Sequence, residues 1–244
     1  WRQDALAPVQ IQQDGGTRYF VAELAVPDAA TPRAMPRRIG LLWDASGSAG
    51  RRDQGLDFAV LDRYFAAVGD AEVRLQLLRD RAAPPVSHRV RGGDWSTLKA
   101  ALREAPNDGA SALAAWVPEP RTQEFLLVSD GLSNYGAGPM PTLRTGQRLF
   151  AINSAGAGAD SARLQAAAEA RGGRLVELAA AADLDRAVRE LRHDAPRIVA
   201  MDGVGVGGRG GRAAARRRRG RRRGGPRGSR RPPARRPGGE GGRP

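Results

Sequence analysis

Residues 38–48 have the sequence RIGLLWDASGS, in which a short apolar run ends at an aspartate followed by two serines. The run at 38–43 is almost uninterrupted, which is typical of a strand buried on both faces of a parallel sheet. Asp44, Ser46 and Ser48 come next, so we expect their side chains at the carboxyl end of this strand. Because ligands of open α/β sheets bind beyond that end, the segment predicts a central strand and a candidate site together.

Helix-like and strand-like patterns alternate along the chain after this run. A helix is predicted at 55–68, because its apolar residues recur at helical spacing on one face. Three more helices are predicted after aspartates that can cap them, Asp94, Asp160 and Asp183. Further strands are predicted at 72–78, 86–90, 125–128, 149–152 and 175–178. This order predicts an α/β fold: a Rossmann-like, doubly wound, mostly parallel sheet with helices on both faces.

The basic charge of the chain is concentrated at its C-terminus. The 244 residues carry a net charge of +14, yet residues 1–202 hold 25 basic and 25 acidic residues. Residues 203–244 hold 15 arginines against one acid, Glu240, and 38 of these 42 residues are Arg, Gly, Pro or Ala. Without aromatic residues or an apolar period this tail cannot bury a core, so it is predicted to be disordered.

Two interpretations of the tail remain open. Its arginines could bind nucleic acid or another anionic surface through phosphate groups. The tail could instead be a frameshift product, because Arg, Gly, Pro and Ala have codon families rich in G and C. The chain has 39 arginines but a single lysine, Lys99, which indicates a genome of that composition. We favour the frameshift, and nucleic-acid binding would depend wholly on the tail, since the remainder carries no net charge.

The chain divides into four segments by composition. They are a β segment (around 19–26) with a Pro-rich linker, the α/β domain, a strand-like exit segment and the tail, at residues 1–37, 38–194, 195–208 and 209–244. The chain begins at Trp1 rather than Met, which we interpret as a piece of a longer protein. It has no cysteine, which excludes disulfides and thiol chemistry. No apolar stretch approaches the ~18 residues that a membrane helix needs.

Two later segments supply further oxygen atoms. Asp130 follows the apolar strand at 125–128, and Ser111 lies in the preceding loop, in the sequence DGAS at 108–111. Carboxylates and hydroxyls are hard donors that suit Mg²⁺, Mn²⁺ or Ca²⁺. For any one residue alone, capping of a turn is the simpler interpretation. For the set we favour a metal site, with five candidate ligands: Asp44, Ser46, Ser48, Ser111 and Asp130.

The D-x-S-x-S pattern at 44–48 resembles the metal-ion-dependent adhesion site of von Willebrand factor A domains. The resemblance covers about residues 38–193, and it rests on three separated elements in the right order. That family adds a threonine from a Gly-rich loop and an aspartate after the fourth strand. By resemblance, Ser46, Ser48 and Ser111 would bind the ion directly, and Asp44 and Asp130 directly or through water. Ser111 replaces the usual threonine and Ala110 a common glycine, which implies weaker metal binding.

The resemblance implies a non-catalytic, cation-dependent protein-binding domain, located in the cell envelope or outside the cell. In such domains an acidic group of a protein partner completes the coordination of the metal. The segments LLWDASGS and VSDGLSNYG are also similar to bacterial proteins that combine a VIT domain with an A domain, akin to inter-alpha-trypsin inhibitor heavy chains. The VIT domain would then lie upstream of Trp1. A degenerate A domain with a structural role only is the alternative, besides nucleic-acid binding through the tail.

The sequence argues against other kinds of site. The segment SGSAG at 46–50 lacks the first glycine of a G-x-S-x-G nucleophile elbow, and His88 and His193 are poorly placed as bases. No carboxylate follows Asp44 by two residues, as a phosphoaspartyl enzyme requires. The glycines at 203–208 precede no helix, so a dinucleotide fingerprint is absent, and two distant histidines do not make a zinc site. Three tryptophans are predicted to pack in the core: Trp43, Trp95 and Trp116.

Overall fold

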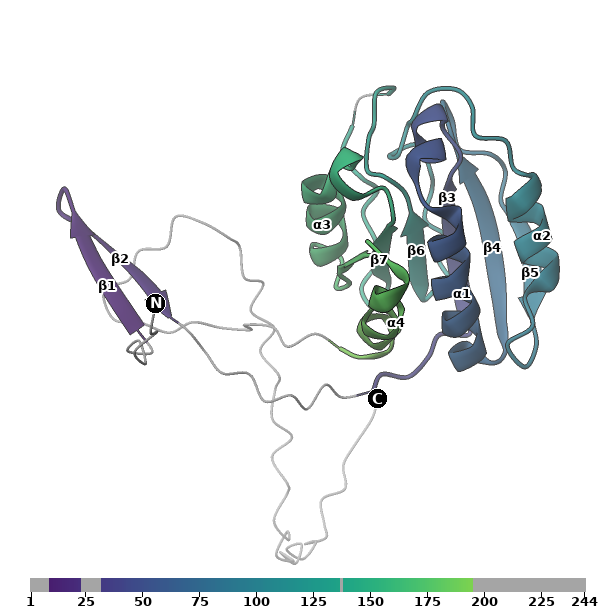
Figure 1. The fold of residues 1–244 in the computed structure, drawn as a ribbon, viewed down its shortest axis with the longest axis horizontal. Helices are drawn as coiled ribbons and strands as arrows, with labels where there is room; N and C mark the ends of the chain where they lie inside the picture. Colours follow the sequence, from purple (N-terminus) through teal and green to yellow (C-terminus); the bar gives the residue numbers. More distant parts are fainter. Residues whose placement is uncertain (1–8, 23–31, 137, 195–244) are drawn as a thin grey trace, which may run out of the picture. The chain divides into compact units, whose positions relative to one another are not determined.

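The computed structural model describes residues 9–22, 32–136 and 138–194, which form a two-stranded hairpin and a six-stranded sheet with helices (Figure 1). The strands are β1 (Val9–Asp14), β2 (Thr17–Ala22), β3 (Arg38–Asp44), β4 (Ala71–Leu78), β5 (Val86–Val90), β6 (Glu124–Val128), β7 (Arg148–Asn153) and β8 (Leu175–Glu177). The helices are α1 (Gln54–Val68), α2 (Ser96–Glu104), α3 (Ser161–Glu169) and α4 (Leu184–Arg192). Short 3-10 turns are η1 (Gly47–Arg51), η2 (Gly156–Gly158) and η3 (Ala181–Asp183).

The large sheet has the strand order β5-β4-β3-β6-β7-β8. The central strand β3 pairs in parallel with β4 and β6, and β7 and β8 continue the parallel part. Only β5 among these six strands runs antiparallel, at the edge beside β4. The predicted Rossmann-like, mostly parallel α/β fold is therefore confirmed.

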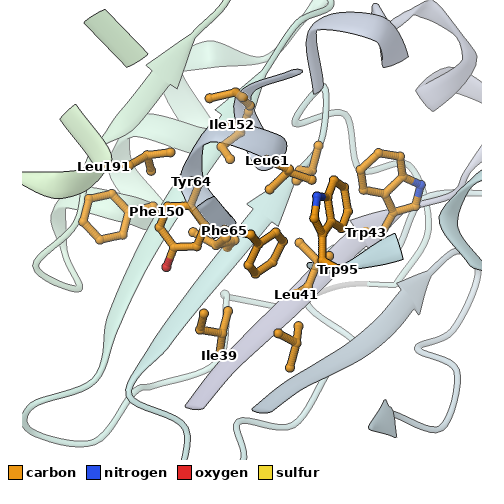
Figure 2. Close-up of a cluster of buried hydrophobic side chains, with 14 of the residues drawn as sticks. Ile39, Leu41, Trp43, Leu61, Tyr64, Phe65, Trp95, Phe150, Ile152 and Leu191 are labelled. Atoms are coloured by element: carbon orange, nitrogen blue, oxygen red, sulfur yellow. The ribbon is translucent and has the colours of Figure 1, made fainter. Parts of the chain in front are cut away.

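Side chains of β3 alternate between two cores, one on each face of the sheet. Ile39, Leu41 and Trp43 are fully buried on the face that α1, α2 and α4 cover (Figure 2). Leu42 lies in the second core, where α3 packs. Helices therefore lie on both faces, as predicted. The three tryptophans predicted to pack in the core are all buried: Trp43, Trp95 and Trp116.

Of the three aspartates expected to cap helices, only Asp160 caps its helix with its side chain. The Asp160 carboxylate accepts a hydrogen bond from the Arg163 backbone N–H at 3.0 Å and caps α3. Asp94 accepts from Ser96 N–H, but it lies one residue before the N-cap position of α2, which Trp95 occupies. The Asp183 carboxylate makes no cap bond to α4. It instead accepts from the Ala179 and Ala180 N–H groups, so it fixes the turn that leads into the helix.

The described ends of the domain are joined to each other. Pro32 and His193 form an antiparallel bridge, and Arg33 N–H donates to the Arg192 carbonyl at 3.0 Å. The Arg33 side chain enters the core and forms an ion pair with Glu124 at 2.5 Å. These contacts attach part of the predicted linker to the α/β domain.

Several sequence predictions lie at or beyond the limits of the described residues. The strand predicted around 19–26 corresponds to β2, which pairs antiparallel with β1, while positions 23–26 lie outside the described ranges. The exit segment at 195–208 and the tail at 209–244 also lie outside them. The predictions for those two segments stay predictions.

Candidate metal centre

Three loops at one edge of the sheet carry the five predicted ligands. Loop A (residues 44–52) begins at the last residue of β3, loop C (residues 129–135) follows β6, and loop B (residues 108–111) precedes β6. Because β3 and β6 are parallel neighbours, loops A and C leave the sheet side by side. The edge is the carboxyl end of the parallel strands, where the sequence placed a ligand site.

Loop A brings its two hydroxyl groups together. The Asp44 Oδ1 atom accepts a hydrogen bond from the Ser46 backbone N–H at 3.1 Å, which folds the loop back on the end of β3. The Ser46 and Ser48 Oγ atoms then lie 3.2 Å apart. The short η1 turn begins within this segment, so both serines are presented by a tightly turned backbone.

Hydrogen bonds join loop B to both of the other loops. The Gly47 N–H donates to the Gly109 carbonyl at 3.0 Å, and the Asp108 N–H donates to the Ala45 carbonyl at 2.9 Å. On the other side, the Asn134 side-chain oxygen accepts from Ser111 N–H at 2.9 Å. Loop B is therefore held between loops A and C.

Loops A and C are also joined directly. The Ser129 hydroxyl donates to Asp44 Oδ2 at 2.6 Å, and Asp130 is the next residue in the chain. Gly131 has φ +78°, and a Cβ atom there would lie 2.6 Å from the Asp160 carbonyl oxygen. Loop C can pass this close to the start of α3 only with glycine at that position. The three loops are thus hydrogen-bonded to one another at the carboxyl end of the parallel strands, and the five predicted ligands lie on them.

The donor atoms fit a hard divalent cation. Asp44, Ser46, Ser111 and Asp130 are at most 2% exposed. Among the described residues, neither Ser111 Oγ nor Asp130 Oδ2 has a hydrogen-bond partner, although both atoms are buried. A buried oxygen left unpaired costs about 1–3 kcal/mol, and more when it is charged. A cation ligated by these oxygens would remove that cost, and the two carboxylates would balance a double positive charge.

This donor set differs from a cluster of carboxylates or imidazoles. No group of three or more His, Asp or Glu side chains gathers to hold an ion within the described ranges. The site depends on hydroxyl oxygens for most of its candidate donors, which suits Mg²⁺ or Mn²⁺ and does not suit zinc.

Three further residues shape the site and were not singled out from the sequence. Ser129 and Asn134 hold Asp44 and Ser111, as described above. The Arg52 guanidinium donates to the Asp44 carbonyl at 2.7 Å and lies 4.5 Å from the Trp43 ring centroid. Only Ser129 had a sequence signal: it follows the apolar strand β6 directly, as Asp44 ends β3.

A buried ion pair joins the last residue of loop A to helix α1. Arg52 contacts Asp57 Oδ2 at 3.1 Å, and neither side chain is exposed. Burial raises the pKa of Asp57 from 3.8 to about 6, against the opposing effect of the Arg52 charge. The native state therefore binds a proton on Asp57 at a pH where the unfolded chain does not.

We expect the Asp57 carboxyl group to make the stability of the folded state depend on pH, with a sign that can be predicted. Because its native pKa is raised, ionised Asp57 destabilises the fold above about pH 6, and that penalty disappears as the pH falls toward 3.8. The stability of wild type relative to Asp57→Asn should rise between pH 7.5 and pH 5, measured by urea unfolding. A difference that stays constant over this range would contradict the raised pKa.

Comparisons with known proteins concern the fold. No family model matches the chain, and no curated protein matches it. Among solved structures, a von Willebrand factor type A protein from Catenulispora acidiphila is 16% identical with a TM-score of 0.46, over 64% of this chain and 42% of that one. Proximal thread matrix protein 1 from the mussel byssus is 15% identical with a TM-score of 0.43, over 64% and 46% of the two chains. BatB from Bacteroides thetaiotaomicron is 12% identical with a TM-score of 0.45, over 63% and 96%.

The match therefore spans less than half of the first two of these proteins. At such identities the likeness extends to the arrangement of strands and helices and no further. The chemistry of the centre has to be derived from the side chains of this chain.

Proposed function

We propose that this chain, whose domain has a von Willebrand factor A-like fold, is a non-catalytic protein-binding module that depends on a divalent cation. Mg²⁺ is the expected ion, with Mn²⁺ or Ca²⁺ as substitutes. The partner is a protein that supplies an acidic side chain at the edge of the sheet where loops A, B and C meet. A bound cation would offer that side chain an open coordination position.

One observation carries the proposal: two buried oxygens on different loops, Ser111 Oγ and Asp130 Oδ2, lack hydrogen-bond partners among the described residues. Turn capping alone does not account for them, because a capping oxygen accepts or donates a bond within its turn. Ser46 and Ser48 add a pair of hydroxyls, and Asp44 adds a second buried negative charge. Ser129, Asn134 and Arg52 keep these donors in place without ligating the ion themselves.

The placement of the histidines supports a binding role over a catalytic one. His88 lies in the edge strand β5, opposite Val73, and burial lowers its pKa. His193 follows α4, and its Nδ1 atom lies 2.8 Å from the Arg189 carbonyl oxygen. Neither histidine lies in loop A, B or C, so these loops present no imidazole base.

The direct test is metal-dependent stabilisation of the whole chain. A cation that binds only the folded state at 100 times its dissociation constant stabilises it by about 2.7 kcal/mol. For a chain of this size, that corresponds to a rise in melting temperature of about 5–10 °C. We expect this rise with MgCl₂ and MnCl₂, one site by titration calorimetry, and reversal by EDTA. Potassium chloride at matched ionic strength is the control. If neither metal raised the melting temperature, the domain would have a structural role only.

Ser111 gives a second test of the ligand set. Ser111→Thr keeps the hydroxyl, so we expect a magnesium affinity equal to or above that of wild type. Ser111→Ala removes the unpaired oxygen and should weaken binding by about tenfold or more. Titration calorimetry of both variants measures the difference. Strong loss in the threonine variant, or none in the alanine variant, would place another residue of loop B at the ion.

The other sequence-based hypotheses stay predictions. Binding of nucleic acid through the tail predicts an affinity that falls steeply with salt and disappears when residues 209–244 are deleted. The same deletion should leave the magnesium response unchanged. No helix in the described ranges is long and apolar enough to cross a membrane. A VIT domain upstream and a place in the cell envelope or outside remain implications of the family resemblance alone.

A further inference from the structure

A second concave site lies at the amino-terminal end of β3 and β4, at the opposite end of the strands from the candidate metal centre. It is a cavity of about 410 Å³, lined by the residue before β3, the start of β4 and the end of β5. Three of the lining side chains are arginines: Arg37, Arg89 and Arg91. The metal loops follow the carboxyl end of β3, whereas this cavity lies by its amino end, so the two sites are separated by the length of the strand.

Strand pairing explains why the arginines converge. Glu72 of β4 pairs with Arg38 of β3 on one side and with Arg89 of β5 on the other. The Arg37 carbonyl accepts a hydrogen bond from the Glu72 N–H at 2.9 Å, which fixes the backbone beside the cavity. The turn after β5 is closed by backbone bonds between Arg91 and Asp94, at 2.9 and 3.2 Å. The backbone positions of the three arginines are therefore set by the sheet and by the turn that follows β5.

The acids at the cavity do not neutralise these arginines. Asp70 Oδ1 accepts a hydrogen bond from the Gly92 N–H at 2.8 Å. Glu72 has its nearest cationic partner in Arg38, at 3.9 Å. Within the described part of the chain, the guanidinium groups of Arg37, Arg89 and Arg91 make no ion pair and no hydrogen bond.

Most other arginines of the domain behave differently. Ion pairs with carboxylates are formed by Arg33, Arg38, Arg52, Arg63, Arg74, Arg79, Arg81, Arg148, Arg163 and Arg186. Three unpaired guanidinium groups around one cavity are therefore a local concentration of donors and positive charge. Each guanidinium presents a planar fork of N–H groups that matches two oxygens of a phosphate.

We propose that this cavity binds a compact, multiply charged phosphate anion, such as a phosphate ester or a polyphosphate. Three forks from two sides of the cavity can engage several phosphate oxygens at once. A compact anion fits better than an extended nucleic-acid strand, because Asp70 and Glu72 on the same wall would repel a continuous line of phosphates. Because none of the candidate metal ligands lines the cavity, we expect the anion to bind there without a divalent cation.

The test is a titration of the full chain with sodium tripolyphosphate in EDTA. Any binding of polyanions by the basic tail would be the same in every variant, so the experiment compares two variants with the same change in charge. Arg89→Ala/Arg91→Ala removes two cavity arginines. Arg144→Ala/Arg189→Ala removes two exposed arginines that also lack side-chain partners among the described residues but lie elsewhere. All four side chains are exposed, so we expect unchanged melting temperatures.

Calorimetry should resolve a saturable site in wild type and in the control variant, and its affinity should fall at least tenfold in the cavity variant. Hydrogen exchange should show protection of residues 86–94 by tripolyphosphate, which locates the site independently of the tail. Free phosphate anion and lipid headgroup are distinguished by phosphatidylcholine vesicles with and without phosphatidic acid. If wild type and the control variant bound the phosphatidic acid vesicles but not tripolyphosphate, and the cavity variant bound neither, the free anion would be overturned and the phosphate assigned to a membrane. Equal affinities in both variants, or protection by single-stranded DNA but not by tripolyphosphate, would overturn the proposal.

Discussion

Replacing Arg33 with alanine should lower the free energy of unfolding by about 3–5 kcal/mol at pH 7. The Arg33 and Glu124 side chains are only 5% and 2% exposed, and they contact each other at 2.5 Å. Removal of the guanidinium leaves the Glu124 carboxylate buried with the Tyr64 hydroxyl, at 2.6 Å, as its remaining side-chain hydrogen-bond partner. A buried carboxylate without its cation is the situation in which loss of one partner costs most.

The loss of stability in Arg33→Ala should become smaller as the pH falls. Burial already raises the pKa of Glu124, against the opposing charge of Arg33. Without Arg33 the carboxyl group has a stronger tendency to remain protonated in the native state. The deficit of the variant should therefore shrink as the pH falls, because protonation removes the unpaired charge.

Urea unfolding of three variants measures these effects. Arg38→Ala is the control, because the Arg38–Glu72 pair is about half exposed and 3.9 Å long, so its loss should cost less than about 1 kcal/mol. The double variant Arg33→Met/Glu124→Leu removes both charges and should recover most of the stability. If Arg33→Ala behaved like the Arg38 control, Arg33 would not belong to the folded domain. The domain boundary at residue 38 would then stand.

This ion pair also shows why sequence analysis placed Arg33 in a linker. The two partners are separated by 91 positions, and nothing in the local pattern at 32–37 distinguishes a buried arginine from a solvated one. The Arg33 Nε–H also donates to the Leu191 carbonyl at 2.7 Å, so this one side chain contacts β6 and the end of α4. A contact of this kind depends on where distant elements meet.

The sheet itself was accessible from the sequence for a physical reason. Strands such as β6 are buried on both faces, so apart from the paired Glu124 at its start β6 is apolar, and the short run at 125–128 marks it. Parallel pairing follows from crossover connections that carry the chain back to the opposite end of the sheet, such as α1 between β3 and β4 and α3 between β7 and β8. The antiparallel direction of β5 was not predicted explicitly. It follows from the short connection after β4, which leaves no room for a crossover helix.

The candidate site was predictable as a set of residue types and not as an arrangement. Asp44 and Asp130 were found because each follows an apolar strand, and strand ends of a parallel sheet share an edge. The supporting bonds were not found. The pairing of Trp43 with Val128 in β3 and β6 brings Asp44 beside Ser129, and only the register fixes that contact. Arg52 reaches the Asp44 carbonyl because the η1 turn reverses the chain, which the sequence of loop A does not specify.

The second large effect is expected for Asp44→Asn. This substitution tests whether Asp44 is a metal ligand or only holds the turn of loop A. Asparagine keeps an oxygen that can accept from Ser46 N–H, and its amide can donate to the Ser129 hydroxyl oxygen, so the hydrogen bonds of loop A can be preserved. The substitution removes one of the two negative charges that would balance a cation. Magnesium affinity should fall on the order of 100-fold, which corresponds to about 2.8 kcal/mol. Without metal, stability should equal or exceed that of wild type, because a buried charge has been removed.

Asp53→Asn is the matched control for this substitution. Asp53 lies just beyond loop A, is exposed, and caps α1 by accepting from Leu56 N–H at 3.1 Å. Asparagine caps helices as well as aspartate, so neither stability nor the magnesium response should change. Melting temperatures of wild type and both variants, each with EDTA and with MgCl₂, give the complete comparison. An Asp44→Asn variant that loses stability equally in EDTA and in MgCl₂ would assign Asp44 to the turn alone, because a metal ligand affects only the magnesium-bound state.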